Sequence, residues 1–470
     1  MPLATALSIR LLPLSRNTKR KSTKFVNEVE ELRDDAERLV KNRNFRRLWS
    51  AQILSQIAQN LLNFALIIRV FDLAQGTKLA NIAVALVILA FGIPSIFFAA
   101  AAGVYIDHWN RKKVLVITNA LRGLLVLGFP FVEHNLALLL LLCFTIASIT
   151  QFFVPAEAAS LPKIVREKDL LRANSLFIFT MYASFIVGYS GSAPVITAFG
   201  NNGPYFVTAF MFALATLLVS LLPVMKAEKR SEVPFKHVLR TTQKEISSNL
   251  RIIRGNRNLS YPILQITLTQ ATIGVLVALA PALSLALLHE PLKNAAHVLI
   301  IPAGIGLVAG IASVGYIVTK ITKVRLMATG FVFAASSLML LGLTGALNKP
   351  IHGHTLVSNS VVAVIVATLV LILGFMNALI SSSAQTILQE NTTDDTRGKV
   401  FGALGMAINI AATLPILFAG ILASLSSVTR VIFGIGSGLL IYALYQFATV
   451  RKHEALEQEY SNSESQKQRE

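Results

Sequence analysis

Long apolar stretches follow one another along most of the chain, and short polar segments separate them. Each stretch has about 20 residues, the length an α-helix needs to cross the hydrocarbon core of a bilayer. The pattern therefore predicts an all-α membrane fold with twelve transmembrane helices. We expect these at Leu48–Phe71, Ile82–Tyr105, Val114–Val132, Leu136–Phe153, Ala173–Ala198, Pro204–Met225, Leu259–Leu288, Val298–Val318, Leu326–Leu347, Val361–Leu388, Val400–Leu425 and Val431–Val450.

Basic residues gather in alternate connecting segments. They cluster after the second, fourth and eighth apolar stretches, and the segment 226–257 holds nine Lys or Arg against three Glu. The segments on the opposite side carry few basic residues: Lys78, Lys293, Lys349 and Arg430 each stand in a different one. Lys and Arg concentrate on the cytoplasmic side of membrane proteins. We therefore expect a multi-pass protein of the cell (inner) membrane with both termini in the cytoplasm.

The polar segments also predict the organisation of the chain. Residues 1–47 are expected to form a basic cytoplasmic region with a short amphipathic helix at Val26–Asn42, and residues 451–470 a disordered cytoplasmic tail. A six-helix bundle at 48–225 is predicted to connect, through the cytoplasmic loop 226–257, to a second bundle at 258–450. The expected fold is thus two six-helix pseudo-repeats.

A weak internal repeat supports this division. The segment after the second stretch reads Gly103-x-x-x-Asp107-His108-x-x-Arg111-Lys112-Lys113, and the segment after the eighth reads Gly315-x-x-x-Thr319-Lys320-x-x-Lys323. The two segments have the same spacing and the same basic character. Self-similarity at a fixed offset indicates related structural units.

Composition excludes several classes of protein. Only 14% of the 470 residues are charged, against roughly a quarter in soluble domains. The net charge of +19 lies in loops and termini, so we expect no nucleic-acid partner. A single cysteine, Cys143, excludes an internal disulfide, and His352-x-His354 has no third metal ligand. With no phosphate-binding loop and no catalytic set, we expect no ATP-driven pump, no enzyme and no cofactor.

The segment from Gly103 to Lys113 resembles the loop signature of the major facilitator superfamily, G-x-x-x-D-[RK]-x-x-[RK]-[RK], with His108 in the second basic place. The resemblance covers residues 42–450 and implies two bundles that rock about a central site. It also implies a conformational latch in which the first loop meets the start of the eleventh helix. The latch residues would be Gly103, Asp107, Arg111, Lys112, Arg397 and Gly398. The alternative is that these charges serve only membrane orientation.

A narrower resemblance concerns two further segments. Phe152-Phe153-x-Pro155-Ala156 and Arg397-Gly398-Lys399-Val400-Phe401 look like the branch that holds macrolide efflux proteins and the enterobactin exporter. This implies secondary export of a small hydrophobic or amphipathic compound, with protons as the coupling ion of an antiporter. Two places where that branch carries an acid hold the amides Gln59 and Asn119, which do not titrate. The energy source is therefore left open.

Polar stripes on the first and seventh helices predict a substrate cavity. Gln56, Gln59 and Asn63 lie on one face of the first helix, and Gln265 and Thr269 on one face of the seventh. The expected cavity residues are Gln56, Gln59, Asn63, Asn119, Arg122, Gln265 and Thr269. The alternative for the stripes is hydrogen bonding between helices. For Arg122 the alternatives are a structural strut or the binding of an anionic substrate.

Three further residues and two rival functions complete the sequence-based hypotheses. Arg69 is expected to pair with Asp72 at the outer interface, and Glu157 to lie at the cytoplasmic mouth. One rival function is facilitation or import of a small polar or anionic solute. The other, from a different class, is a membrane receptor or scaffold that transports nothing. The expected partners are a small-molecule substrate, the lipid bilayer and protons.

Overall fold

A computed structural model describes residues 39, 41–106, 109–225, 257–347, 358–392 and 394–467. In this part of the chain the regular elements are helices. The N-terminal half contains α2 (Arg43–Ala74), α3 (Ala80–Ile106), α4 (Arg111–Val126), α5 (Phe129–Val132), α6 (Leu136–Ile164), a 3₁₀ turn at Glu167–Asp169, α7 (Leu170–Phe199) and α8 (Gly203–Ser220). The C-terminal half contains α10 (Arg257–Leu288), α11 (Leu292–Val318), α12 (Lys323–Leu347), α13 (Asn359–Glu390), α14 (Asp394–Leu425) and α15 (Val428–Lys467).

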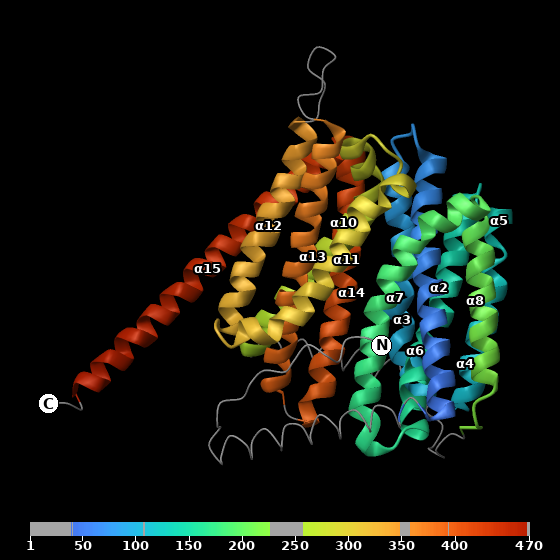
Figure 1. The fold of residues 1–470 in the computed structure, drawn as a ribbon, viewed down its shortest axis with the longest axis horizontal. Coiled ribbons are helices and arrows are strands. Elements are labelled where there is room, and N and C mark those ends of the chain that lie inside the picture. The colour runs from blue at the N-terminus through green and yellow to red at the C-terminus, as the bar shows by residue number, and fades with distance from the viewer. Residues whose placement is uncertain are drawn as a thin grey trace, which may run out of the picture.

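The long helices form two bundles side by side, one from each half of the chain (Figure 1). Within the described residues, nine helices are long and apolar enough to cross a membrane, and two shorter apolar helices lie at Ala80–Ser95 and Thr413–Leu425. The all-α membrane fold expected from the sequence is confirmed. The amphipathic helix predicted at Val26–Asn42 falls mainly, and the loop 226–257 almost entirely, outside the described residues.

Three elements differ from the prediction. The third predicted helix is divided, because Gly128 and Pro130 interrupt it and a separate short helix, α5, begins at Phe129. The fourth extends past its predicted end to Ile164, with Pro155 and Pro162 inside it. The last helix, α15, continues to Lys467, where we expected a disordered tail.

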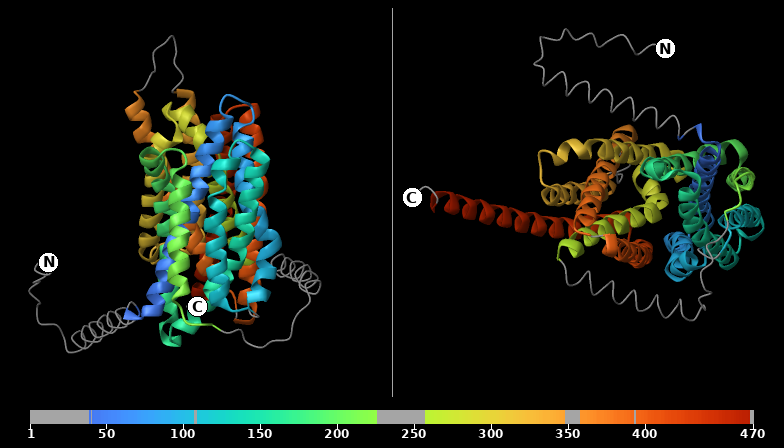
Figure 2. Two further views of the ribbon diagram at one scale, coloured as in Figure 1. Left: turned by 90° about the vertical axis from the view of Figure 1, so that its right-hand side faces the viewer. Right: turned by 90° about the horizontal axis from the view of Figure 1, so that it is seen from below.

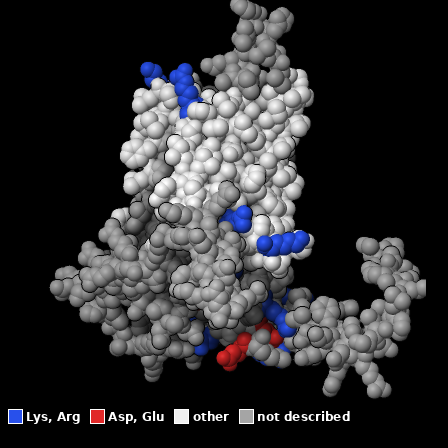
Figure 3. Space-filling model, turned by 90° about the vertical axis from the view of Figure 1, so that its left-hand side faces the viewer, with Lys and Arg blue, Asp and Glu red and all other residues white. Residues whose placement is uncertain are grey.

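Charged residues divide the molecule into two ends. We call the end with Arg43, Arg111, Arg166 and Lys320 the basic end, and the end with the connections α2–α3, α10–α11 and α14–α15 the opposite end. Figure 3 shows an uncharged band between the Lys and Arg side chains at the two ends of the C-terminal half. This is the surface that a bilayer would contact.

The two halves share an apolar core at the opposite end. One cluster contains Phe64 and Ile68 of α2, Tyr189 of α7, Leu283 of α10 and Ala419 of α14. Toward the basic end, each half has its own cluster: one is built from α2, α4, α6, α7 and α8, and another from α10 and α12–α15. Two further views show the bundles from the side and from the basic end (Figure 2). Apolar packing thus joins the halves at the opposite end.

Small residues allow close packing of helices. A Cβ atom on Gly188 of α7 would lie 2.6 Å from Asn60 Cβ and 2.9 Å from the carbonyl oxygen of Ile57 on α2. A Cβ atom on Gly306 of α11 would lie 2.0 Å from the carbonyl oxygen of Leu371 on α13. Both distances are far below van der Waals contact, so only glycine permits these approaches.

Candidate functional site: a cavity between the two halves

A cavity of about 450 Å³ lies between the two halves. Its walls come from α2 and α7 of the N-terminal half and from α10–α13 and α15 of the C-terminal half. The volume is within the range of small-molecule binding sites. Because both bundles contribute to one space, a change in their relative position would change the space directly.

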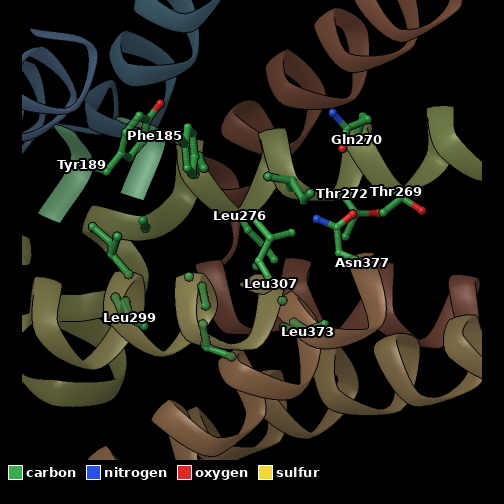
Figure 4. Close-up of a pocket in the computed structure, with 18 of the residues that line it drawn as sticks. Phe185, Tyr189, Thr269, Gln270, Thr272, Leu276, Leu299, Leu307, Leu373 and Asn377 are labelled. Carbon is green, nitrogen blue, oxygen red and sulfur yellow. The ribbon is translucent and has the colours of Figure 1, made fainter. Parts of the chain in front are cut away.

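The polar groups of the cavity lie toward the basic end and the apolar groups toward the opposite end. The wall residues of α10 run from Thr269 and Gln270 to Leu283, about 20 Å at 1.5 Å per residue. On α13, Asn377 lies nearer the basic end than Leu373 does. Figure 4 shows Thr269, Thr272, Gln270 and Asn377 on one side, and Phe185, Tyr189 and Leu299 on the other. We call the polar part, formed by Gln56, Asn60, Thr269, Gln270, Thr272 and Asn377, the collar.

The collar offers amide groups that are free to bind a ligand. Among the described residues, the side chains of Gln56 and Gln270 have no hydrogen-bond partner. Gln56 comes from α2 and Gln270 from α10, so the two amides belong to different halves. An uncharged amide both donates and accepts hydrogen bonds. The described part of the cavity wall contains no Asp, Glu, Lys, Arg or His.

The predicted cavity residues fall into two groups. Gln56 and Thr269 line the cavity, but Gln59, Asn63 and Gln265 are not part of its wall. Gln59 Nε2 donates a 2.9 Å hydrogen bond to Asn63 Oδ1 within α2. The Gln265 amide nitrogen donates to Tyr442 and Gln446 of α15 at 3.1 and 3.0 Å. The Gln265 bonds connect two helices, as the alternative interpretation stated, whereas the Gln59–Asn63 bond stays within one helix.

Of the collar residues, Asn60, Gln270, Thr272 and Asn377 were not among the cavity residues predicted from the sequence. Gln270 and Asn377 are the residues that a stripe pattern overlooks, because each stands on a largely apolar face. The sequence signal that could have found them is weaker than a stripe, because it is a single amide in the middle of an apolar span. An amide exposed to lipid is costly, so it indicates either a hydrogen-bond partner or a cavity.

Arg122 and Asn119 lie inside the N-terminal half, away from the cavity wall. Arg122 is 2% exposed, and its guanidinium donates to Asn119 Oδ1 at 2.6 Å and to the Thr118 carbonyl at 3.3 Å. The rings of Phe153 and Phe212 cover it at 4.3 and 4.6 Å. Among the described residues, Arg122 has cation–π contacts and no counterion at hydrogen-bond distance. These contacts favour the structural strut over the binding of an anionic substrate.

The position of Glu157 and the acidic partner of Arg69 differ from the prediction. Glu157 was expected at the cytoplasmic mouth, but it is buried within α6, because this helix continues beyond its predicted end and includes Glu157. Its carboxyl group there attracts the Arg122 guanidinium. Arg69 binds Glu133 rather than Asp72, and the Arg69 Nε–Glu133 Oε2 distance is 3.0 Å. Glu133 is the C-cap of α5, the short helix that the sequence pattern did not separate.

The latch residues are only partly described. Gly103 lies near the end of α3, and Arg111 and Lys112 begin α4, with Arg111 buried. Asp107 is outside the described residues, and of Arg397 and Gly398 only the helical backbone in the first turns of α14 is described. The contact between α3 and α14 is found toward the opposite end, where the backbone of Gly420 approaches Ala85. The latch itself stays a prediction.

Comparisons with known proteins agree with this architecture. The family model of the Major Facilitator Superfamily matches residues 48–412. The chain is 22% identical over 400 residues to the uncharacterized MFS-type transporter YfiS of Bacillus subtilis, covering 83% of this chain and 90% of that protein. It is 27% identical to the transporter YkuC of the same organism, over 42% of this chain and 46% of that protein. It is 24% identical to macrolide efflux protein A of Streptococcus pyogenes, over 51% of this chain and 58% of that protein.

Solved structures show the same fold. A bacterial homologue of the human lysosomal transporter Spinster, in an inward-facing and unoccupied conformation, aligns with a TM-score of 0.67 at 11% identity over 87% of this chain and 98% of that chain. The nucleoside transporter NupG aligns with a TM-score of 0.66 at 13% identity over 85% of this chain and all of that chain.

Proposed function

Because the chain belongs to the Major Facilitator Superfamily, we propose that it is a secondary active transporter that exports a small hydrophobic or amphipathic compound by alternating access. Macrolide efflux protein A, a putative bacilysin exporter and a multidrug efflux pump are among its relatives. Their names support the export direction. The mainly apolar cavity supports the substrate class.

The main observation behind this proposal is the position of the cavity relative to the apolar cores. The core shared by both halves forms part of the cavity wall and continues beyond it toward the opposite end, whereas the halves have separate cores near the basic end. The positive-inside rule places the basic end in the cytoplasm. A solute would therefore enter from the cytoplasmic side, and the bundles would then separate at the opposite end to release it.

Two alternatives receive less support. An anionic solute would need a cation in the cavity, and Arg122 is instead enclosed by Phe153, Phe212 and Asn119. A receptor or scaffold has no need for a cavity built from both halves. Import of an uncharged polar solute is the remaining rival, and the direction of transport separates it from export.

The closing of the basic end would depend on the latch. Asp107 would contact the first turn of α14 near Gly398 when the two halves meet there, because a carboxylate is stabilised at the positive N-terminus of a helix. If protons drive export, Glu157 is the carboxylate placed inside the N-terminal half to bind them. Both roles are part of the proposal.

Export can be tested in cells that lack their own efflux pumps. Cells expressing the chain should accumulate less radiolabelled chloramphenicol, which is uncharged, or less of another compound from a panel of apolar drugs, than cells with the empty vector. Asp107→Ala should abolish the difference, whereas Glu167→Ala, an exposed acid at the same end, should retain it. Equal accumulation for every compound would contradict transport, and increased accumulation would indicate import.

A further inference from the structure

The absence of charge in and around the cavity extends beyond its wall. No Asp, Glu, Lys or Arg occurs in residues 258–288, 298–319, 326–347, 359–389, 400–425 or 431–450, which include the apolar parts of all six helices of the C-terminal half. In the N-terminal half, α7 carries no such residue after Arg172. His297 of α11 is exposed at the opposite end. No titratable acid or base can therefore reach the cavity from these helices.

The two arginines within the apolar stretches of the N-terminal half, Arg69 and Arg122, are engaged elsewhere. Arg122 is covered by two aromatic rings and hydrogen-bonded to Asn119, and its attraction to Glu157 stays within the same half. Arg69 binds Glu133 at the opposite end. Neither guanidinium belongs to the described cavity wall. A charged ligand against the described cavity wall would consequently have no counterion in that wall.

Transfer of an ion without a counterion from water into the cavity has a large free-energy cost, because the amides of the collar replace only part of the ion's hydration. The rings of Phe185 and Tyr189 in the wall could attract a cation, but a cation–π contact is much weaker than the hydration that an ammonium group loses. An uncharged group that donates or accepts hydrogen bonds avoids this cost, since the free amides of Gln56 and Gln270 can satisfy it.

We propose that the cavity selects an uncharged amphiphile, whose apolar body lies against Leu276, Leu299 and Tyr189 and whose hydrogen-bonding head group, a hydroxyl or an amide, lies at the collar between Gln56 and Gln270. This inference rests on the proposed function, since it concerns the ligand of the same cavity. It goes further by excluding cations and anions, including the permanently charged drugs that a multidrug exporter could carry.

A matched set of three ligands tests the charge selectivity. Radiolabelled phenylhexanol, phenylhexylamine and phenylhexanoic acid share one apolar body and differ in the head group, and at a pH of about 8 the second is a cation and the third an anion. Binding to the full chain in lipid nanodiscs is measured by equilibrium dialysis. Empty nanodiscs, and competition with excess unlabelled phenylhexanol, separate saturable binding from partition into lipid.

The expected result is saturable binding of the alcohol, with a dissociation constant at least about tenfold lower than that of either ion, a difference that corresponds to about 1.4 kcal/mol. Equal or tighter binding of the amine or the acid would overturn the inference. So would the absence of saturable binding of the alcohol.

Variants locate the selectivity in the collar. Gln270→Glu, or Gln56→Glu in the other half, should tighten binding of the amine at least about tenfold, because either adds the missing counterion. Gln75→Glu adds the same charge in the exposed connection after α2 and should change nothing. If neither collar variant exceeds Gln75→Glu, the proposed binding position is refuted.

These results are distinguishable from those that test export. Saturable binding of phenylhexanol without export of any compound in the panel would refute the proposed function and leave the ligand class intact. Export of a permanently cationic drug would refute the uncharged ligand and leave export intact.

Discussion

Replacement of Gly188 by alanine tests the contact between α7 and α2. A Cβ atom at this position would lie 2.6 Å from Asn60 Cβ and 2.9 Å from the Ile57 carbonyl oxygen. A backbone oxygen does not move aside as a flexible side chain can, so the helices must separate. Overpacking of this kind costs about 1–3 kcal/mol.

Gly191→Ala is the matched control, three residues further along the same helix. A Cβ atom on Gly191 meets nothing within 4 Å. Alanine is favoured over glycine in a helix by about 0.5–1 kcal/mol, so this variant should be as stable as the wild type or slightly more stable. Both variants gain this helix propensity, so overpacking alone should separate them, by at least about 1 kcal/mol in the free energy of unfolding.

The chain contains its own reporter for this assay. Cys143 is the only cysteine and is completely buried in α6, so a thiol-reactive fluorogenic maleimide reacts only when the N-terminal half opens. At about 2–4 °C per kcal/mol, the midpoint of Gly188→Ala should lie at least about 2 °C below that of Gly191→Ala at one fixed heating rate. A midpoint equal to or above that of the control would refute the packing argument.

Three further predictions concern buried polar groups, each measured as the thermal midpoint of the purified protein. Arg122→Gln should cost about 2 kcal/mol or more because it removes the cation–π contacts with Phe153 and Phe212 and the charged hydrogen bond to Asn119, and a midpoint equal to that of the wild type would contradict the strut. Gln265→Leu should cost only about 0.6 kcal/mol and leave phenylhexanol binding unchanged, since its partners are on α15; weakened binding would place it in the cavity. Glu133→Gln should lower stability by about 1 kcal/mol through loss of the charged bonds from Arg69, and no change would show that the pair contributes nothing.

Most of the fold could be predicted from the sequence, because the length of an apolar span and the position of basic loops are local properties of the chain. The exceptions have local causes that hydropathy does not weigh. Gly128 and Pro130 interrupt the third helix, and a hydropathy average over the span does not register this backbone effect. The fourth helix continues past Phe153 and includes Glu157. A hydropathy window ends the span before this carboxyl group, whereas in the structure the group is buried in the same half as the Arg122 cation.

The cavity was less accessible, because a polar stripe on one helix does not identify its partners. Gln265 and Thr269 lie one turn apart on the same face of α10, yet one binds α15 and the other lines the cavity. The difference arises from the packing of α15, which is about 180 residues away in sequence. Isolated amides such as Gln270 become meaningful only when their surroundings are known.

The burial of Arg122 has a consequence for how the protein is made. Phe153 of α6 and Phe212 of α8, which enclose the guanidinium, are synthesised after α4. An arginine in the middle of a helix costs about 2.5–3.5 kcal/mol to insert into lipid, and α4 is not among the helices apolar enough to insert alone. During biogenesis, α4 must therefore wait at the translocon until its later neighbours arrive. In the C-terminal half, α10–α13 and α15 have uncharged cores and are long and apolar enough to enter the bilayer one by one.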